Sequence, residues 1–272
     1  CEQSVEEVLI QAKTLLEKIK VYEIRIQAYT SQQKLLEAIS IGREVLKKFG
    51  INFPQNPTPE DIQKGLEETA TLISDKTIEQ LKNLPSIKDK HQLAIMRIAS
   101  SMIPPAYIAD QMLFPLIILS QVNLSIQHGN GALSAFCYAC YAILLKSIID
   151  DIESSNKFGR LALDLAEEFD YKDIKAKTYY VNGAFIIHSN SHIKETLPIL
   201  LKAYKLGLEI GSLDFVGYSA KEICHHSFFI GKELTELEEQ IENYIDVLDT
   251  LKQFTTSNCC KIFRQSILNF QS

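Results

Sequence analysis

The chain has 272 residues, of which 46% are hydrophobic and 23% charged, enough apolar material for a sizeable packed core. Its formal net charge of −6 argues against a surface that binds nucleic acid or an anionic membrane. With only 11 glycines and 8 prolines, the chain is poor in the residues that an all-β or loop-rich fold needs. No apolar run reaches the length of a membrane span, and the most apolar one, residues 113–119, is typical of a buried helix.

The chain begins at Cys1 and ends at Ser272 inside a predicted helix, so we interpret it as a piece of a longer polypeptide. Targeting signals at the true termini would then lie outside it. Its six cysteines occur mostly in apolar helical contexts, and their spacing is not that of a secreted disulfide framework. We therefore expect a reducing, cytoplasmic compartment.

Two helices are predicted at the start of the chain. Apolar residues at helical spacing run from Ser4 to Tyr29 and again from Gln32 to Phe49. Gly50 follows in the position of a glycine that ends a helix. Residues 1–50 are therefore predicted to form a first helical pair.

The segment 51–91 interrupts the helical pattern. Its first nine residues hold three prolines and predict an extended connection. Thr58 is a suitable N-cap for a helix with Pro59 at its first position and Asp61 in its first turn, and this helix is expected to run to about Ile73. A shorter helix is expected from about Thr77. We interpret 51–91 as an insertion that serves as a spacer, with a hinge or a lateral docking surface as alternatives.

A second helical pair is predicted after the insertion. Residues 91–102 form its first helix, which Pro104 and Pro105 are expected to end. Residues 111–128 form its second helix, and the glycine-containing residues 129–131 are expected to be a flexible turn.

The clearest pattern in the sequence is a repeat of 41 residues, whose units begin at Leu133, Ile174 and Phe215. Small residues occupy matching positions seven apart in the first half of each unit, where a neighbouring helix can approach closely. These small residues are Ala135 and Ala142, Ala176 and Gly183, and Gly217 and Cys224. The second half of each unit carries one apolar stripe at helical spacing. Each unit is therefore predicted to be a helix A, a short turn and a helix B, stacked on its neighbours.

These patterns predict an all-α fold: a right-handed superhelical array of antiparallel helix pairs, or α-solenoid. Its parts are the pair 1–50, the inserted connection 51–91, four tandem helix-pair repeats at 92–255, and a truncated helix of a further repeat at 256–272. The repeat is longer than the tetratricopeptide (TPR) repeat of about 34 residues and is nearer the armadillo and HEAT range. We therefore describe the array as TPR-like.

Three groups of residues have part of the pattern of a metal or redox site, and none is complete. Cys137 and Cys140 have no second cysteine pair at metal-site spacing. Cys224, His225 and His226 are adjacent on a predicted helix, so their side chains diverge. His188 and His192 are four residues apart but lack a third ligand. The sequence also lacks a glycine-rich phosphate loop and kinase catalytic motifs. We therefore expect no catalytic residue, no cofactor and no metal in this segment.

Several short segments of the sequence resemble the helical middle region of large bacterial multi-sensor signal transduction multi-kinases. They span most of the chain and are Gly42–Leu46, Pro54–Ile62, Ile103–Ala109, Asp151–Ser154, Lys194–Pro198 and His226–Leu234. The resemblance implies a parent protein with a Ser/Thr protein kinase domain, an AAA-type ATPase module, a TPR-like array, a GAF sensor and a histidine kinase or other output domain. This chain would be the array, and no kinase or ATPase residue lies within it.

Arrays of this kind usually bind other proteins. We therefore predict a non-catalytic protein-interaction and signal-relay region, with a protein or peptide as partner, such as a flanking kinase, ATPase or GAF domain, and no nucleic acid or membrane. The residues predicted to line the partner groove are Arg97, Tyr138, Tyr141, Tyr179, Asn182 and His226. For each tyrosine, the alternative is a partly buried packing residue whose hydroxyl is hydrogen-bonded.

Two other functions compete with this hypothesis. The chain could be a structural spacer that holds catalytic domains apart, which predicts no well-formed concavity. It could also be a small-molecule sensor or enzyme with a pocket between repeats near Cys224 and His225, which predicts a deep pocket with clustered polar groups.

Overall fold

The computed structural model describes residues 14–271, and this part of the chain holds thirteen α-helices, α2 to α14, with no β-strand among them. The predicted all-α helical array is therefore confirmed. The chain divides into two compact units, residues 1–137 and residues 138–272. The boundary falls inside helix α8, Ala132–Ser147. None of the described helices is both long enough and apolar enough to cross a membrane.

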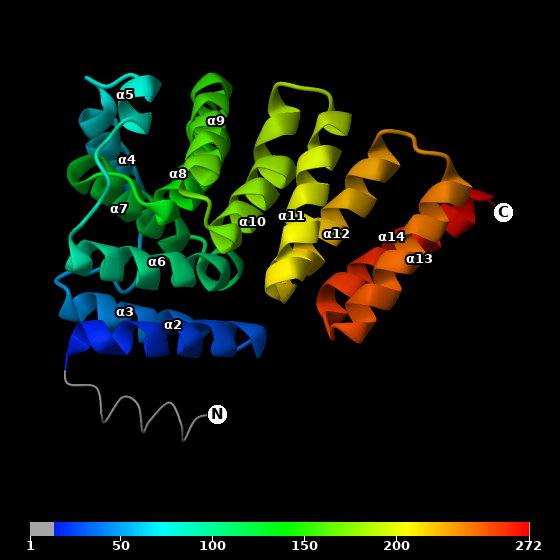
Figure 1. Cartoon of the computed structure of the whole chain (residues 1–272), viewed down its shortest axis with the longest axis horizontal. Helices are drawn as coiled ribbons and strands as arrows, with labels where there is room; N and C mark the ends of the chain where they lie inside the picture. The colour runs from blue at the N-terminus through cyan, green and yellow to red at the C-terminus, as the bar shows by residue number, and fades with distance from the viewer. Residues whose placement is uncertain (1–13, 272) are drawn as a thin grey trace. The chain divides into compact units, whose positions relative to one another are not determined.

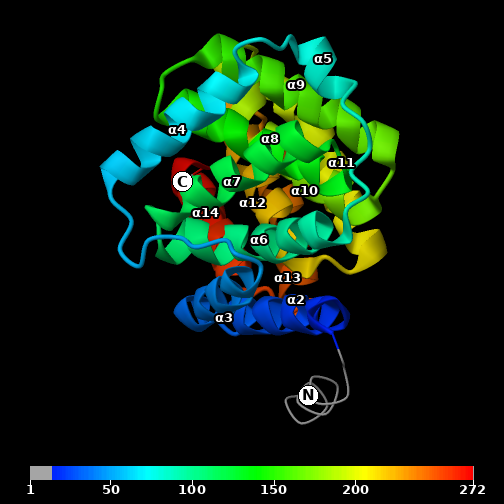
Figure 2. The same ribbon diagram turned by 90° about the vertical axis from the view of Figure 1, so that its left-hand side faces the viewer.

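In the first unit, α2 (Leu15–Ser31) and α3 (Leu35–Lys48) lie side by side and pack against α6 (Lys90–Ala109), as Figure 2 shows. These two helices are the predicted first pair, although the predicted start near Ser4 lies outside the described residues. Gly42 makes the close packing of α3 on α6 possible, because a Cβ atom there would lie 2.2 Å from Sδ of the buried Met102.

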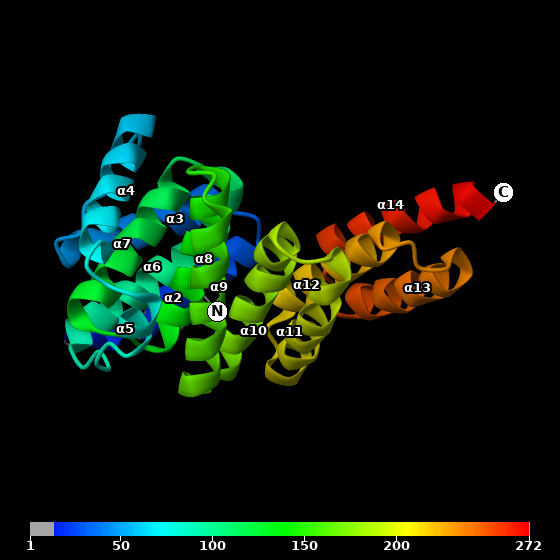
Figure 3. The same cartoon turned by 90° about the horizontal axis from the view of Figure 1, so that it is seen from above.

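The insertion forms α4 (Pro59–Ile73) and α5 (Ile78–Lys82), as predicted. Thr58 caps α4: its Oγ1 accepts from the backbone nitrogen of Asp61 at 3.3 Å, and its own backbone nitrogen donates to the Asp61 carboxylate at 2.9 Å. Thr77 and Gln80 form the same reciprocal cap on α5. Helix α4 packs across α7 (Leu113–His128), which Figure 3 shows from above.

The prediction that Pro104 and Pro105 end their helix is wrong, because α6 continues through both to Ala109. The fixed φ of proline is compatible with an α-helix, so the cost is limited to missing hydrogen-bond donors and local crowding. Ile103 and Ala106 of the same turn are buried, and this packing holds the last turns in place. Tertiary packing has overridden a local stop signal.

The turn after α7 is fixed by hydrogen bonds, in contrast to the flexible turn that the sequence predicted. Gly129 has φ 103° and ψ 170°, a conformation that is essentially confined to glycine. The backbone nitrogen of Asn130 donates to the Pro85 carbonyl at 2.9 Å, and the Asn130 carbonyl accepts from Ile87 at 2.8 Å. The Asn130 side chain also donates to the Leu81 carbonyl at 2.7 Å. This turn therefore attaches the end of the insertion to the end of α7.

In the second unit, successive helices pack on one another in chain order, from green to red in Figure 1. They are α9 (Ile152–Phe169), α10 (Lys172–Val181), α11 (Leu197–Ile210), α12 (Leu213–Phe229), α13 (Leu234–Thr250) and α14 (Phe254–Gln271). Helices α10, α12 and α14 start one period apart, and α12 contacts both of the others. They are the helices A of the predicted repeat.

Small residues of the repeat mark close helix contacts in the second unit. A Cβ atom on Gly217 of α12 would lie 2.4 Å from Oγ1 of Thr256 in α14. A Cβ atom on Gly207 of α11 would lie 2.9 Å from a methyl group of Val216 in α12. Small side chains at these positions therefore allow the helix spacing of the array.

One repeat departs from the pattern. After α10 the chain forms a π-helical turn at Asn182–Ile186 and two short 3₁₀ segments at Ile187–Ser189 and Ile193–Thr196 before α11 begins. A π-helical turn within a helix is uncommon and is frequently found at functional sites.

Candidate functional site

The predicted groove residues Tyr138 and Tyr141 are buried, with 0% and 3% of their surface exposed. Both pack against Phe158, with ring centroids 5.8 Å and 4.9 Å apart. Burial raises the pKa of Tyr141 to about 12, and the nearby Asp151 carboxylate acts in the same direction. These tyrosines pack inside the second unit.

Tyr179 and Asn182 are also buried, at 7% and 1% exposed. The Tyr179 hydroxyl donates to the Glu167 carboxylate, and burial together with this bond raises the pKa of Tyr179 to about 12. Asn182 donates to the Thr178 carbonyl at 3.0 Å and begins the π-helical turn.

The last two predicted residues lie in different units. Arg97 belongs to the first unit, where its guanidinium pairs with the Glu23 carboxylate (Nε to Oε1, 3.0 Å) and joins α6 to α2. His226 belongs to the second unit and is 4% exposed. Side chains as buried as the four residues above and His226 offer a partner almost no contact area, so the packing alternative describes them better than a groove.

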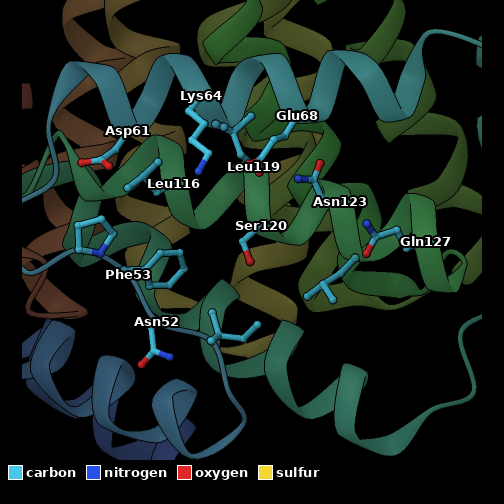
Figure 4. Close-up of a pocket in the computed structure, with 14 residues that line it drawn as sticks. Asn52, Phe53, Asp61, Lys64, Glu68, Leu116, Leu119, Ser120, Asn123 and Gln127 are labelled. Carbon is cyan, nitrogen blue, oxygen red and sulfur yellow. The ribbon is translucent and has the colours of Figure 1, made fainter.

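An open groove does exist in the first unit, where the insertion meets α7. We call it the α4–α7 groove, and its volume is about 450 Å³. Figure 4 shows the walls: the extended segment 51–54 on one side, α4 on the other, and α7 as the floor. Its lining residues are Ile51, Asn52, Phe53, Pro54, Asp61, Lys64, Gly65, Glu68, Leu116, Leu119, Ser120, Asn123, Leu124 and Gln127.

Arg43 of α3 holds the extended wall of the groove. Its guanidinium donates to the carbonyls of Pro54 at 2.7 Å and Phe53 at 3.4 Å. The same group lies 3.7 Å from the Asp110 carboxylate at the end of α6. One cation therefore ties the proline-containing connection to the helices beside it.

The other side of the groove is set by the crossing of α4 and α7. Gly65 permits this crossing, because a Cβ atom there would lie 3.0 Å from Cδ1 of Leu119. The Thr69 hydroxyl of α4 donates to Oδ1 of Asn123 on α7 at 2.8 Å. The hydrogen bond orients the Asn123 amide at the edge of the groove.

The floor of the groove presents a row of uncharged polar side chains. Ser120, Asn123 and Gln127 follow one another along one face of α7, at the spacing of neighbours on a helix surface. From α4, the charged side chains of Lys64 and Glu68 lie over this row, and Figure 4 shows Lys64 pointing toward the space above Ser120. Amide groups offer a donor and an acceptor together, which is what peptide backbone groups require.

One feature of the sequence indicates this groove. The helix predicted at residues 111–128 is mostly apolar but is interrupted by polar residues, and three of these, Ser120, Asn123 and Gln127, lie on one face, while Gln121 and Ser125 lie off it. A polar stripe on a helix that packs under an insertion indicates a surface that contacts water or a ligand.

No protein-family model matches the chain, and no solved structure matches it. The chain is similar to one curated signalling protein, a hybrid histidine kinase. This is Hybrid signal transduction histidine kinase G of Dictyostelium discoideum, with 21% identity over 244 residues.

The match covers 82% of this chain and 7% of that protein, so the chain corresponds to a small part of its relative. A signalling context for the chain is thus supported, in line with part of the resemblance stated above.

Proposed function

We propose that the chain is a non-catalytic interaction and relay region of a larger signalling protein, and that the α4–α7 groove binds an extended peptide segment of a partner or of a flanking domain. The observation that carries this proposal is the polar row of Ser120, Asn123 and Gln127 on the floor of an open groove. The similarity to a signal transduction histidine kinase supports the signalling context.

The dimensions of the groove suit a short extended peptide. From Ser120 to Gln127 the helix advances about 10 Å at 1.5 Å per residue. An extended chain advances about 3.3 Å per residue, so the row faces roughly three peptide residues. Lys64 can pair with an acidic side chain of that peptide, and Asp61 or Glu68 with a basic one.

Binding in the groove would act on several helices of the first unit. The extended wall is attached to α3 through Arg43, the opposite wall is α4, and the floor is α7. A peptide that draws the walls together therefore changes the position of α4 relative to α7, which is the relay step that we propose.

A spacer role remains the competing function, and it predicts that no peptide binds. The test is a tiled peptide array that covers the full-length parent protein, probed with the labelled chain and with two variants. Ser120→Tyr fills the floor of the groove. Ser40→Tyr makes the same change on an exposed position of α3 and serves as the control.

We expect some peptides to bind both the unsubstituted chain and Ser40→Tyr. The same peptides should bind Ser120→Tyr at least tenfold more weakly, a loss of about 1.4 kcal/mol. Circular dichroism of both variants tests whether they fold. Peptides that bind Ser120→Tyr equally well would place the interaction elsewhere, and no binding by any tile would favour the spacer.

A further inference from the structure

A second group of polar side chains lies in the second unit, on one face of α12. Glu222, His225 and His226 are spaced i, i+3 and i+4, so a single helix presents all three together. Oε2 of Glu222 lies 3.2 Å from Nδ1 of His225 and 3.8 Å from Nε2 of His226. One potential ligand atom from each residue falls within 4.8 Å of the other two.

Two of these separations lie near those of a metal coordination shell. Ligand atoms at about 2.0–2.1 Å from a tetrahedral zinc ion are roughly 3.3 Å apart. The distance from Oε2 to His225 is close to that value, and the distance to His226 is about half an ångström longer. Adjacent side chains on a helix were expected to diverge, but His225 and His226 both approach the Glu222 carboxylate, and Glu222 takes the place expected for Cys224.

The hydrogen bonds around His226 direct a lone pair into this space. The Thr196 hydroxyl donates to the Ile193 carbonyl at 2.7 Å, so its oxygen accepts the proton of His226 Nδ1 at 2.6 Å. In the neutral tautomer that this arrangement favours, Nε2 carries no proton and faces the Glu222 carboxylate. Two acceptors that face each other leave a place for a cation, and an Nδ1 bond of this kind is the usual support of a metal-bound histidine.

The surrounding charges leave the inner carboxylate oxygen available. Lys221 pairs with the other oxygen of Glu222, Oε1, at 2.6 Å. Lys146 is directed at the Phe185 carbonyl at 3.0 Å and at Nε2 of His188 at 3.3 Å. Neither ammonium group is shown bound to Oε2.

Access to the site is through His225, whose side chain is 39% exposed, whereas those of Glu222 and His226 are 9% and 5% exposed. The His225 ring lies against Phe229 and Phe263, with centroids 4.9 Å and 5.1 Å away. A metal ion can therefore enter from solvent at a ring whose orientation is already restricted, and water can complete its coordination.

We infer that Glu222, His225 and His226 form a binding site for a divalent transition metal, with Zn²⁺ as the best-suited ion. Two imidazole nitrogens and one carboxylate oxygen are a known zinc ligand set, and water in the fourth position completes the tetrahedron. When His225 binds the metal, its Nδ1 exchanges the contact with Glu222 for the ion. The inference is independent of peptide binding in the first unit.

The test is a titration of the chain, purified without a histidine tag and stripped with chelator, with Co²⁺ and then with competing Zn²⁺. Visible cobalt bands report the coordination geometry without any assay of activity. We expect one Co²⁺ per chain, displaced by Zn²⁺, and an affinity at least tenfold lower in Glu222→Gln and in His225→Gln. His128→Gln removes an exposed histidine of the first unit and serves as the control.

Zn²⁺ should also raise the melting temperature of the parent chain and of His128→Gln, and not that of His225→Gln. Three results would overturn the inference. They are no stoichiometric binding to the parent chain, binding that His225→Gln leaves unchanged, or an ultraviolet thiolate-to-cobalt band showing that cysteines hold the metal.

Discussion

Replacing Gly129 by alanine tests how firmly the insertion is attached to the first unit. The added Cβ atom would lie 2.0 Å from the Pro85 carbonyl oxygen, which belongs to the backbone and cannot rotate away. Gly129 also has φ 103°, where an alanine is strained whatever the space around it.

The expected cost follows from these two effects. A non-glycine residue in this backbone conformation costs roughly 1–3 kcal/mol. Moving the Pro85 carbonyl away breaks its 2.9 Å hydrogen bond from Asn130. The loss of such a bond adds about 1 kcal/mol. Gly129→Ala should therefore lower the free energy of unfolding by about 3 kcal/mol, a large share of the roughly 5–15 kcal/mol typical of a folded domain.

Urea denaturation followed by circular dichroism measures this change, and Gly50→Ala is the matched control. Gly50 has φ +82°, and a Cβ atom there would meet no atom within 4 Å. Its substitution measures the cost of a side chain at positive φ without a steric contact, roughly 1–2 kcal/mol. If Gly129→Ala costs no more than Gly50→Ala, the contact with Pro85 does not anchor the insertion and the reasoning fails.

Three further outcomes follow from the structure. Arg43→Ala removes the donor that holds the extended wall of the groove, so peptides found in the array should bind about tenfold more weakly. Fluorescence anisotropy measures this affinity, and an unchanged affinity would show that the extended wall does not contribute to binding. Asp249 accepts from the Ser257 hydroxyl at 2.6 Å, and this bond is the main cause of its lowered pKa. The carboxylate therefore stabilises the fold above the unfolded-state pKa, and this contribution is lost as the pH falls through the lowered folded-state pKa. Asp249→Asn should then show a smaller fall in melting temperature between neutral and acidic pH than the unsubstituted chain. Melting temperatures that fall equally in both would contradict this. Burial raises the pKa of Cys137 to about 12, so a timed iodoacetamide pulse should alkylate the partly exposed Cys259 first, and equal labelling by peptide mapping would refute the difference.

The helices themselves were predictable from local signals. The start of α4 is indicated by three residues, Thr58, Pro59 and Asp61. The structure places all three in the predicted roles. The 41-residue period likewise gives the start of each helix A, because the same small residues recur where helices approach. Such features depend on residues near in sequence and were therefore readable.

The sites were less predictable, because they depend on what lies across from each helix. Aromatic and polar residues such as Tyr138 and Asn182 can line a groove or pack in an interior, and only the packed structure shows them buried. The polar row of α7 can be recognised in the sequence, but the crossing of α4 over it joins residues 54 apart, and no local pattern encodes that crossing. The role of Glu222 could have been predicted from the sequence, since its i, i+3 and i+4 spacing places it near His225 and His226 on a helix.

The insertion between the first two helical pairs is held at both of its ends. Arg43 fastens its start to α3, and the turn at Gly129 and Asn130 fastens its finish to the end of α7. The two ends of the insertion are thereby in place before any partner arrives, and the movement of α4 that we propose takes place between them. A partner peptide would lose its own conformational freedom on binding, but the protein would lose little of its own, so even a short peptide can bind with useful affinity.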